Sequence, residues 1–383
     1  MQHRRFSVLS ALDAQSEKIL CKLLAEADVR IDGARPHDLV VHDRRFYTRV
    51  LRDGSLGLGE AYMDGQFDCE ALDVAVSKVL AARVEQKVRA NWSRILHVLK
   101  ARALNLQSPL RAFRVGEQHY DLGNHLYERM LDPRMVYTCG YWRGAKDLAA
   151  AQEAKLDLVC RKLELEPGMK VLELGCGWGS FAKFAAERYG VEVTGYTVSR
   201  EQVELGMKRS RGLPVVLRLA DYREAIGTYD RVVSIGIMEH IGYKNYRSYF
   251  EVVDRCLATD GLALVHTIGG NLSSRTIEEW FHKYIFPNAL LPSLAQIAEA
   301  SEGPFAIEDV HNFGPHYDRT LMAWYDNFEA AWPELRDKYG DRFYRMWRYY
   351  LLASAGGFRA RYQQLYQVVF SRTGRPQPSC RVS

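Results

Sequence analysis

A glycine-rich run between a predicted strand and a predicted helix is the first feature of the chain that could do chemistry. Glycine occupies three alternate positions of Glu173-Leu-Gly-Cys-Gly-Trp-Gly179. The apolar run Lys170 to Leu174 predicts a buried strand before the loop, and Gly190 closes the helix after it. Glycine is needed in such a loop because a ligand must approach the backbone closely while the chain turns sharply. The run therefore predicts a cofactor-binding loop.

The spacing of these glycines separates two classes of cofactor. The nicotinamide fingerprint is G-x-G-x-x-G, whereas this loop is G-x-G-x-G, as in class I methyltransferases that bind S-adenosylmethionine. Ala220-Asp221-Tyr222 directly follows another predicted strand, where methyltransferases of this type commonly hold the adenine. A nicotinamide-binding loop remains the structural competitor, and the spacing favours S-adenosylmethionine.

The elements that must position this loop alternate between strand and helix from about residue 155 onward. Such alternation predicts a doubly wound parallel sheet of the Rossmann-like methyltransferase type in an α/β protein. Ser199 followed by Gln202 is a capping-box pattern that predicts the start of the helix after the second strand. The predicted strands are Lys170 to Leu174, Val191 to Thr194, Val215 to Leu219, Arg231 to Ile235 and Leu262 to His266.

The length of 383 residues predicts a second, smaller domain beside the large one. We predict a small N-terminal α+β domain over residues 1–75, a basic amphipathic helical linker over 76–109 and a catalytic domain over 110–383. The glycine-dense run Asp53 to Glu60 has no strand before it and no phosphate-loop lysine. We therefore interpret it as a turn and not as a nucleotide loop.

The predicted linker concentrates positive charge. From Lys78 to Arg114 there are nine basic residues and one acid, Glu85, a local charge of +8 in a chain with a net charge of +5. Apolar residues recur at steps of three and four between Val84 and Leu99, which predicts an amphipathic helix. Such a helix suits an anionic membrane surface. An interdomain helix that packs on its own protein and, less favoured, an RNA-binding face are the alternatives.

The cysteines and the apolar runs indicate the compartment. Seven scattered cysteines without a CxxC pair argue against a disulfide framework and against a zinc site, so no metal is expected. The sequence contains no run long enough to span a bilayer and no signal-peptide pattern at its start. These features predict a cytoplasmic protein that is soluble or peripheral to the membrane.

Six motifs together resemble the cyclopropane-fatty-acyl-phospholipid synthases. The resemblance covers nearly the whole chain, including the N-terminal unit that the shorter mycolic-acid relatives lack. The motifs are Gly175-Cys-Gly-Trp-Gly179, Gly116-Glu-Gln-His-Tyr-Asp-Leu-Gly-Asn124, Met238-Glu-His-Ile-Gly242, Asp53 to Asp64, Tyr284-Ile-Phe-Pro-Asn288, and His311-Asn-Phe-Gly314 with Tyr317-Asp318.

The resemblance implies an S-adenosylmethionine site. Thr138 stands where the family often has serine, and the hydroxyl is kept. Class I methyltransferases often end the second strand with an acid that binds the ribose, but here the run is Gly195-Tyr-Thr-Val-Ser, so hydroxyls must substitute. For Gln202, helix capping and a cofactor contact are both compatible. The expected cofactor residues are Tyr137, Thr138, Glu173, Gly175, Gly177, Gly179, Thr197, Gln202, Asp221 and Tyr222.

The resemblance also implies a bound bicarbonate held by Cys139, Glu239, His266, Tyr317 and the Ile268 carbonyl. Glu239 and His266 follow the ends of predicted parallel strands, where ligands of open α/β sheets collect. His266 and Tyr317 can donate hydrogen bonds to an oxyanion, whereas Glu239 would have to meet a bicarbonate hydroxyl or be protonated. A lone cysteine is more often buried and inert, and His266 equally fits a hydrogen-bonded core histidine.

The function that the resemblance implies is methylene transfer from S-adenosylmethionine to cis double bonds of phospholipid acyl chains. The resulting carbocation would be deprotonated by the bicarbonate to close a cyclopropane ring. A methyl-branching fatty-acyl methyltransferase and a methyltransferase of a soluble substrate are the alternatives. The expected partners are a phospholipid bilayer with unsaturated chains at the inner face of the cell membrane and a second copy in a homodimer, with no nucleic acid.

Neutralising Arg83, Lys87, Arg89 and Arg94 tests the predicted linker. Each basic residue close to an anionic leaflet contributes about 1 kcal/mol to binding. We therefore expect the fourfold variant to bind anionic liposomes more weakly in a sedimentation assay, with activity on detergent-dispersed substrate retained. Unchanged liposome binding would make this helix an internal packing element.

Overall fold

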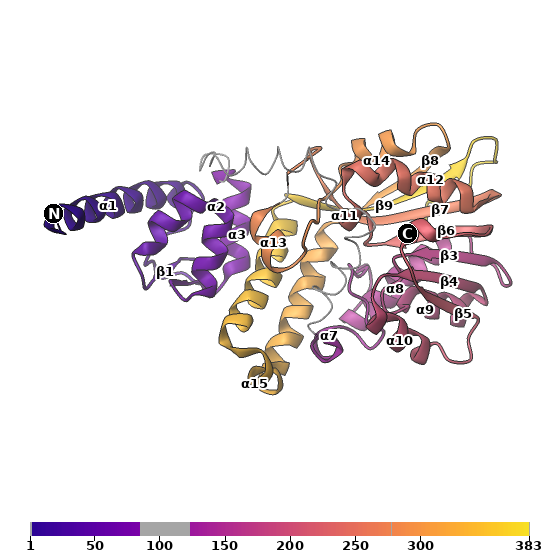
Figure 1. The fold of residues 1–383 in the computed structure, drawn as a ribbon, viewed down its shortest axis with the longest axis horizontal. Coiled ribbons are helices and arrows are strands. Elements are labelled where there is room, and N and C mark those ends of the chain that lie inside the picture. The colour runs from indigo at the N-terminus through magenta and orange to yellow at the C-terminus, as the bar shows by residue number, and fades with distance from the viewer. Residues whose placement is uncertain (1, 85–122, 277, 383) are drawn as a thin grey trace. The chain divides into compact units, whose positions relative to one another are not determined.

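The computed structural model describes residues 2–84, 123–276 and 278–382, with side chains from Ala14 onward. The chain divides into two compact units (Figure 1). The first unit contains the described residues within 1–103, 276–285 and 321–362. The second contains those within 104–275, 286–320 and 363–383.

A seven-stranded sheet forms the centre of the second unit, in the order β5-β4-β3-β6-β7-β9-β8. The five strands from β5 to β7 are parallel, and β9 runs antiparallel to both of its neighbours. The strands are β3 (Lys170–Leu174), β4 (Glu192–Thr197), β5 (Val215–Leu219), β6 (Tyr229–Ile235), β7 (Leu257–Gly270), β8 (Phe305–Asn312) and β9 (Gln363–Arg372).

Helices cover both faces of this sheet, because alternate strand residues contribute to two separate apolar cores. Val171 and Val233 belong to the core shared with the helices α8 and α9, whereas Leu172 and Val232 belong to the core shared with α12 and α14. This arrangement confirms the doubly wound prediction. The helices of the unit are α7 (Asn124–Met130), α8 (Leu148–Lys162), α9 (Ser180–Tyr189), α10 (Arg200–Arg209), α11 (Met238–Ile241), α12 (Tyr246–Cys256) and α14 (Leu294–Ser301).

The predicted strands agree with the observed ones, and the sequence interpretation missed β8 and β9. The runs 170–174 and 215–219 coincide with β3 and β5. The second strand, β4, continues to Thr197, three residues beyond its predicted end. The Ser199 hydroxyl caps α10 by accepting a hydrogen bond from the Gln202 backbone amide at 3.3 Å, as the capping pattern predicts.

The first unit combines helices with a two-stranded antiparallel sheet. The strands are β1 (Val40–Val41) and β2 (Phe67–Asp68). Its helices are α1 (Gln2–Glu26), α2 (Arg45–Met63), α3 (Leu72–Ala81), α13 (Glu279–Tyr284) and the part of α15 (Pro315–Arg359) from residue 321 onward. Segments from three distant parts of the sequence thus build one unit, a grouping that the contiguous predicted ranges do not contain.

The turn predicted for Asp53 to Glu60 is wrong, because this run lies within α2. Only Gly54 leaves the helical conformation, with φ 57° and ψ −129°, and kinks the helix. The other glycines serve close packing. A Cβ atom on Gly59 would lie 2.3 Å from the Trp280 ring of α13, and one on Gly57 would lie 2.5 Å from the Arg49 carbonyl oxygen.

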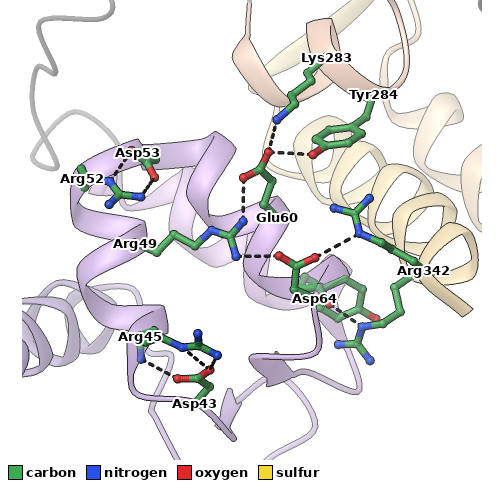
Figure 2. A network of polar contacts seen from close by, with 12 residues as sticks. Asp43, Arg45, Arg49, Arg52, Asp53, Glu60, Asp64, Lys283, Tyr284 and Arg342 are labelled. Atoms are coloured by element: carbon green, nitrogen blue, oxygen red, sulfur yellow. Dashed lines mark hydrogen bonds and ion pairs between the residues drawn. The ribbon is translucent and has the colours of Figure 1, made fainter.

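Ion pairs and hydrogen bonds reinforce the contact between α2 and α13 (Figure 2). Glu60 accepts hydrogen bonds from the Lys283 ammonium at 2.5 Å, the Tyr284 hydroxyl at 2.7 Å and the Arg49 guanidinium at 2.7 Å. Burial alone would raise the pKa of Glu60, but these three donors lower it to about 2. Arg49 also donates a hydrogen bond to Asp64 at 2.9 Å. The DGSLGLGEAYMD run therefore holds α2 and α13 together within the first unit.

Most of the predicted linker lies outside the described residues. The predicted boundary at residue 75 falls inside α3, residues 85–109 are not described, and neither is Gly116 to Leu122 of the GEQHYDLGN run. The predicted domain boundaries and the basic helix therefore remain predictions. Among the helices of the described residues, none is long and apolar enough to cross a membrane.

Substituting Gly59 by alanine tests the packing role of the glycine run. The added methyl group overlaps the Trp280 indole, so we expect a loss of about 2 kcal/mol in the free energy of unfolding, measured by urea denaturation. In a Trp280→Leu background the overlap is removed, and the same substitution should cost at least about 1 kcal/mol less. Equal costs in both backgrounds would contradict this role.

Candidate active site

The glycine loop connects β3 to α9 in a backbone conformation that residues other than glycine rarely adopt. Gly175, Gly177 and Gly179 have φ values of 76°, 53° and 71°, a left-handed region that glycine occupies without strain. A Cβ atom on Gly175 would meet Ile237 at 3.0 Å and one on Gly179 would meet Leu217 at 2.9 Å, whereas one on Gly177 would meet nothing within 4 Å. The backbone at Gly177 is therefore open to a ligand.

The end of β4 forms the wall beside this loop. A Cβ atom on Gly195 would lie 2.8 Å from that of Cys176, so the loop packs directly on β4. The Thr197 hydroxyl donates to the side-chain oxygen of Gln202 at 2.7 Å. The Gln202 side-chain oxygen therefore binds Thr197 and not the backbone amide at the start of α10. Its side-chain nitrogen is left as the group that can donate to a ligand.

Asp221 and Tyr222 follow β5 in a short 3-10 turn. Both carboxylate oxygens of Asp221 accept hydrogen bonds from the Arg223 guanidinium, at 2.7 and 2.8 Å. The Tyr222 hydroxyl is buried without a hydrogen-bond partner. Asp221 is thus placed as predicted, but its carboxylate is held by a residue that the sequence interpretation missed.

Two side chains of α8 hold the segment that contains Tyr137 and Thr138. Gln152 donates its side-chain amide to the Thr138 carbonyl oxygen at 2.7 Å, and Lys155 donates its ammonium to the Thr138 hydroxyl at 2.9 Å. The Tyr137 ring packs 5.1 Å from that of Tyr127. The sequence interpretation did not identify Gln152 or Lys155 as part of the site.

Glu173, near the end of β3, is a buried carboxyl group with an unfilled hydrogen-bonding position. Its side chain is 3% exposed and its Oε2 atom has no partner. Burial raises its pKa to about 8, against an opposing effect of Lys155. A carboxyl group in this state is ready to accept a hydrogen bond from a ligand.

The ends of β6 and β7 bring Glu239, His266 and Ile268 together. Ile235 is the register partner of His266 in the parallel pair, and α11 begins three residues later at Met238. The Ile268 backbone amide donates to Glu239 Oε1 at 2.6 Å, while Oε2 has no partner. Burial raises the pKa of Glu239 to about 7.

His266 is held neutral and oriented. Burial lowers its pKa well below the usual value, and Lys155 and Lys162 lower it further. Its Nδ1 atom lies 3.3 Å from the side-chain nitrogen of Gln367, and its Nε2 atom has no partner. With the Gln367 amide nitrogen as donor, Nδ1 takes the acceptor role, and the tautomer with its proton on Nε2 can donate to a ligand.

Cys139 and Tyr317 complete the predicted set through the start of α15. The Cys139 thiol is fully buried, donates to the Gly140 carbonyl oxygen at 3.2 Å and has its pKa raised by burial. Thr320 packs its hydroxyl 3.9 Å from the Cys139 sulfur and accepts the Gly140 amide at 3.0 Å. Tyr317 is buried one turn before Thr320, after the loop whose Phe313 ring lies 5.9 Å from His266.

Some buried polar atoms without a hydrogen-bond partner belong to predicted site residues. Such an atom costs about 1–3 kcal/mol, and the described residues contain thirteen of them, four in the predicted set. Glu173 Oε2 and Tyr222 Oη lie in the segments around the glycine loop, and Glu239 Oε2 and His266 Nε2 lie at the ends of β6 and β7. The predicted residues therefore form two regions of unmet hydrogen bonds. One lies beside the glycine loop, and the other, called the β6–β7 edge, lies at Glu239, His266 and Ile268, where the parallel pairing of β6 and β7 ends.

Comparison with known sequences gives a family and close relatives. The family model described as mycolic acid cyclopropane synthetase matches residues 107–368. The cyclopropane-fatty-acyl-phospholipid synthase of Escherichia coli K12 is 51% identical over 364 residues, which cover 95% of each chain. Tuberculostearic acid methyltransferase UfaA1 of Mycobacterium tuberculosis is 33% identical and covers 86% of this chain and 81% of its own.

Comparison with solved structures supports the fold. The cyclopropane synthase MmaA2 from Mycobacterium tuberculosis is 30% identical, with a TM-score of 0.63, and the match covers 68% of this chain and 98% of that one. The mycolic acid cyclopropane synthase CmaA1, solved with SAH and CTAB, is 32% identical with the same TM-score and coverage. The sequence match to the E. coli protein therefore extends further along the chain than these structural matches.

Substituting Glu239 by glutamine tests the buried carboxyl group. Because its folded pKa is raised to about 7, its contribution to stability is present below the ordinary pKa of a glutamate and is lost as the pH rises through 7. Glutamine keeps the acceptor for the Ile268 amide without this loss. We expect the variant to be more stable than the parent at pH 8.5, on the order of 2 kcal/mol, with a much smaller difference at pH 5.

Urea denaturation at both pH values measures this difference. Glu251→Gln, which changes an exposed carboxylate on α12, is the matched control and should shift neither curve by more than about 0.5 kcal/mol. If Glu239→Gln gives the same difference from the parent at both pH values, the buried carboxyl group is not the source of the pH dependence.

Proposed function

The chain belongs to the mycolic acid cyclopropane synthetase family and is an S-adenosylmethionine-dependent methyltransferase, and on that premise we propose that it converts cis double bonds of phospholipid acyl chains into cyclopropane rings. The observation that carries the proposal is the 51% identity to the E. coli cyclopropane-fatty-acyl-phospholipid synthase over 95% of both chains. The two regions of unmet hydrogen bonds support the proposed site residues.

The glycine-loop region fits S-adenosylmethionine. We propose that the open backbone at Gly177 admits the cofactor, that Glu173 accepts a hydrogen bond from it and that the Tyr222 hydroxyl donates one. Bound there, the cofactor would supply an electrophilic methyl group on a sulfonium sulfur. The remaining proposed contacts are Tyr137, Thr138, Gly175, Gly179, Thr197, Gln202 and Asp221.

The β6–β7 edge fits a bicarbonate ion. In this proposal His266 Nε2 donates to an oxyanion, and Glu239 Oε2 accepts the bicarbonate hydroxyl when ionised or donates to a bicarbonate oxygen when protonated. Bicarbonate would supply the base that takes a proton from the new methyl group. Cys139, Tyr317 and the Ile268 carbonyl complete the proposed set. The buried Cys139 thiol is not a nucleophile, since its pKa is raised and its proton is donated to the Gly140 carbonyl oxygen.

The protein's own contribution to the reaction is position and exclusion of water. An alkene is a weak nucleophile, so the site must hold it in line with the reactive methyl group. The carbocation formed on the acyl chain must be shielded from water until it loses a proton. A neutral histidine and a weakly acidic glutamate beside it hold the base without quenching the cation.

A methyl-branching reaction is the second candidate. It is favoured by the 33% identity to an enzyme named tuberculostearic acid methyltransferase. The same carbocation, if reduced, gives a methyl branch with two more hydrogens than the ring product, so product mass separates the two outcomes. A methyltransferase of a soluble substrate would instead place label from the cofactor in a water-soluble product.

We further propose that the chain acts at the inner face of the cytoplasmic membrane as a peripheral protein and as a homodimer. The phospholipid in the E. coli relative's name and the +8 charge between Lys78 and Arg114 support a lipid surface. The proposed division of labour follows the predicted domains: residues 1–75 and the linker 76–109 associate with lipid, and residues 110–383 carry the chemistry.

Mass spectrometry of acyl chains tests this function. The protein is incubated with unsaturated phospholipid vesicles, S-adenosylmethionine and bicarbonate, and we expect a gain of one methylene per double bond in unsaturated chains alone. His266→Ala should lower turnover at least about 100-fold while leaving cofactor affinity within about twofold. Unmodified lipid despite cofactor binding would favour the soluble-substrate methyltransferase.

A further inference from the structure

Lys155 is a fully buried cation without a counter-ion among the described residues. Its side chain is 1% exposed, and its ammonium group has one hydrogen-bond partner, the neutral Thr138 hydroxyl at 2.9 Å. No carboxylate oxygen of the described residues forms an ion pair with it within 4.0 Å. A buried charge costs several kcal/mol unless it is paired.

The same helix provides the contrast. Lys162, two turns further along α8, is also buried, but its ammonium lies 2.8 Å from the Asp309 carboxylate in an ion pair. The two lysines lie on the same helix and are equally buried, so they differ only in their partners. Lys162 has a counter-ion from the protein, so Lys155 is the one whose counter-ion must come from elsewhere.

The groups around Lys155 do not fill this role. Asp132, Glu173, Cys139 and Cys160 act on its charge from neighbouring segments. Burial raises the pKa of each of these four groups, and the Asp132 carboxylate accepts the Arg134 and Val136 backbone amides at 2.9 Å. The pKa of Lys155 is lowered to about 8, mainly by burial. These groups therefore act on Lys155 without forming an ion pair with it.

A chain of contacts leads from Lys155 to the β6–β7 edge. The Thr138 hydroxyl binds Lys155, while the Thr138 methyl carbon lies 3.1 Å from the position that a Cβ atom on Gly236 would occupy. The Gly236 amide donates to the His266 carbonyl oxygen at 2.8 Å. Lys155 also acts electrostatically on the Cys139 thiol and on His266, so its charge is felt at this edge from two sides.

We propose that Lys155 supplies the positive charge that stabilises the bicarbonate anion at Cys139, Glu239 and His266, and that the Thr138 hydroxyl fixes the position of its ammonium group. The inference rests on the proposed function, because it takes bicarbonate as the anion. Lys155 is a positioning residue, because it acts on the anion through Thr138 and does not touch it.

The charge of Lys155 and the binding of the anion are then linked. Protonated Lys155 favours the bound anion, and the bound anion favours protonated Lys155. Burial lowers the pKa of Lys155 to about 8, so its loss of charge adds to the fall in bicarbonate affinity that the deprotonation of Glu239 and Glu173 causes as the pH rises. A lysine that only braces the Thr138 segment adds nothing to that fall.

Methionine at position 155 tests the proposal, because it keeps the length of the side chain without the charge. Removing an unpaired buried charge leaves folding unharmed or improves it, so the variant should unfold in urea at the same concentration as the parent or a higher one. Binding of [13C]bicarbonate, followed by line broadening in carbon NMR with S-adenosylhomocysteine present, should weaken at least about tenfold at pH 7.5.

Two further variants separate charge from shape. Lys155→Arg keeps the charge and should retain bicarbonate affinity within about threefold. Lys183→Met removes a half-buried lysine of α9 whose ammonium lies 3.6 Å from the Glu187 carboxylate, and it should leave bicarbonate affinity unchanged. Across pH 7 to 9 Glu239 and Glu173 also lose protons, so both proteins should lose bicarbonate affinity, and the parent should lose it more steeply than the Lys155→Met variant.

The outcomes distinguish this inference from the function beneath it. If the parent protein does not bind bicarbonate and turns over without it, the bicarbonate part of the proposed function fails. If the parent binds bicarbonate and Lys155→Met binds it equally well, the role of Lys155 fails while the proposed function stands. If Lys155→Met loses cofactor affinity but keeps bicarbonate affinity, Lys155 serves the cofactor region that contains Glu173, and the proposal is overturned.

Discussion

Side chains alternate between the two faces of a strand, so a slip of one residue in pairing turns every one of them to the opposite side. The parallel register of β3, β6 and β7 therefore decides where the site residues lie. Leu174 pairs with Ser234, and Ile235 pairs with His266. β3 and β6 end at this level, where the glycine loop and the segment before α11 begin, while β7 continues past His266 and Ile268 to Gly270.

Two apolar cores hold this register. One core lies between the sheet and α8 and α9, and the other lies between the sheet and α12 and α14. They must stabilise a site that is itself unfavourable in the empty protein, since Glu173, Lys155 and Glu239 are buried with shifted pKa values. Each of these groups costs folding free energy that a bound ligand can return. The site is thus preorganised for ligands at the expense of stability in their absence.

Hydrophobic runs were enough to predict the parallel strands, because a strand buried on both faces is a short continuous apolar segment bounded by turns. The same rule did not identify β8, where Glu308, Asp309 and His311 interrupt the apolar pattern at the edge of the sheet. The glycine-dense run was misinterpreted for a different reason. Gly59 is required by the approach of Trp280, a residue more than two hundred positions away, and no local pattern contains that information.

The candidate site shows the same division between local and distant information. The glycine loop and the ends of β6 and β7 follow from local spacing. Lys155 does not, because the polar residues of Leu148 to Lys162 are those of an ordinary solvent-facing helix until the fold buries Gln152, Lys155 and Lys162. Arg223 and Gln367 were missed as well, since their roles depend on the orientation of Asp221 and His266.

The resulting site is chemically mild, and this suits the proposed reaction. A carbocation on an acyl chain would be captured by any strong nucleophile within reach. The Cys139 thiol is kept protonated by burial, His266 presents an N–H group instead of a lone pair, and Glu239 is shifted toward its neutral form. The side chains at this edge therefore donate or share protons and offer no reactive anion of their own. A small bound base is then the group that can take the proton, and the unpaired positive charge of Lys155 would favour its binding.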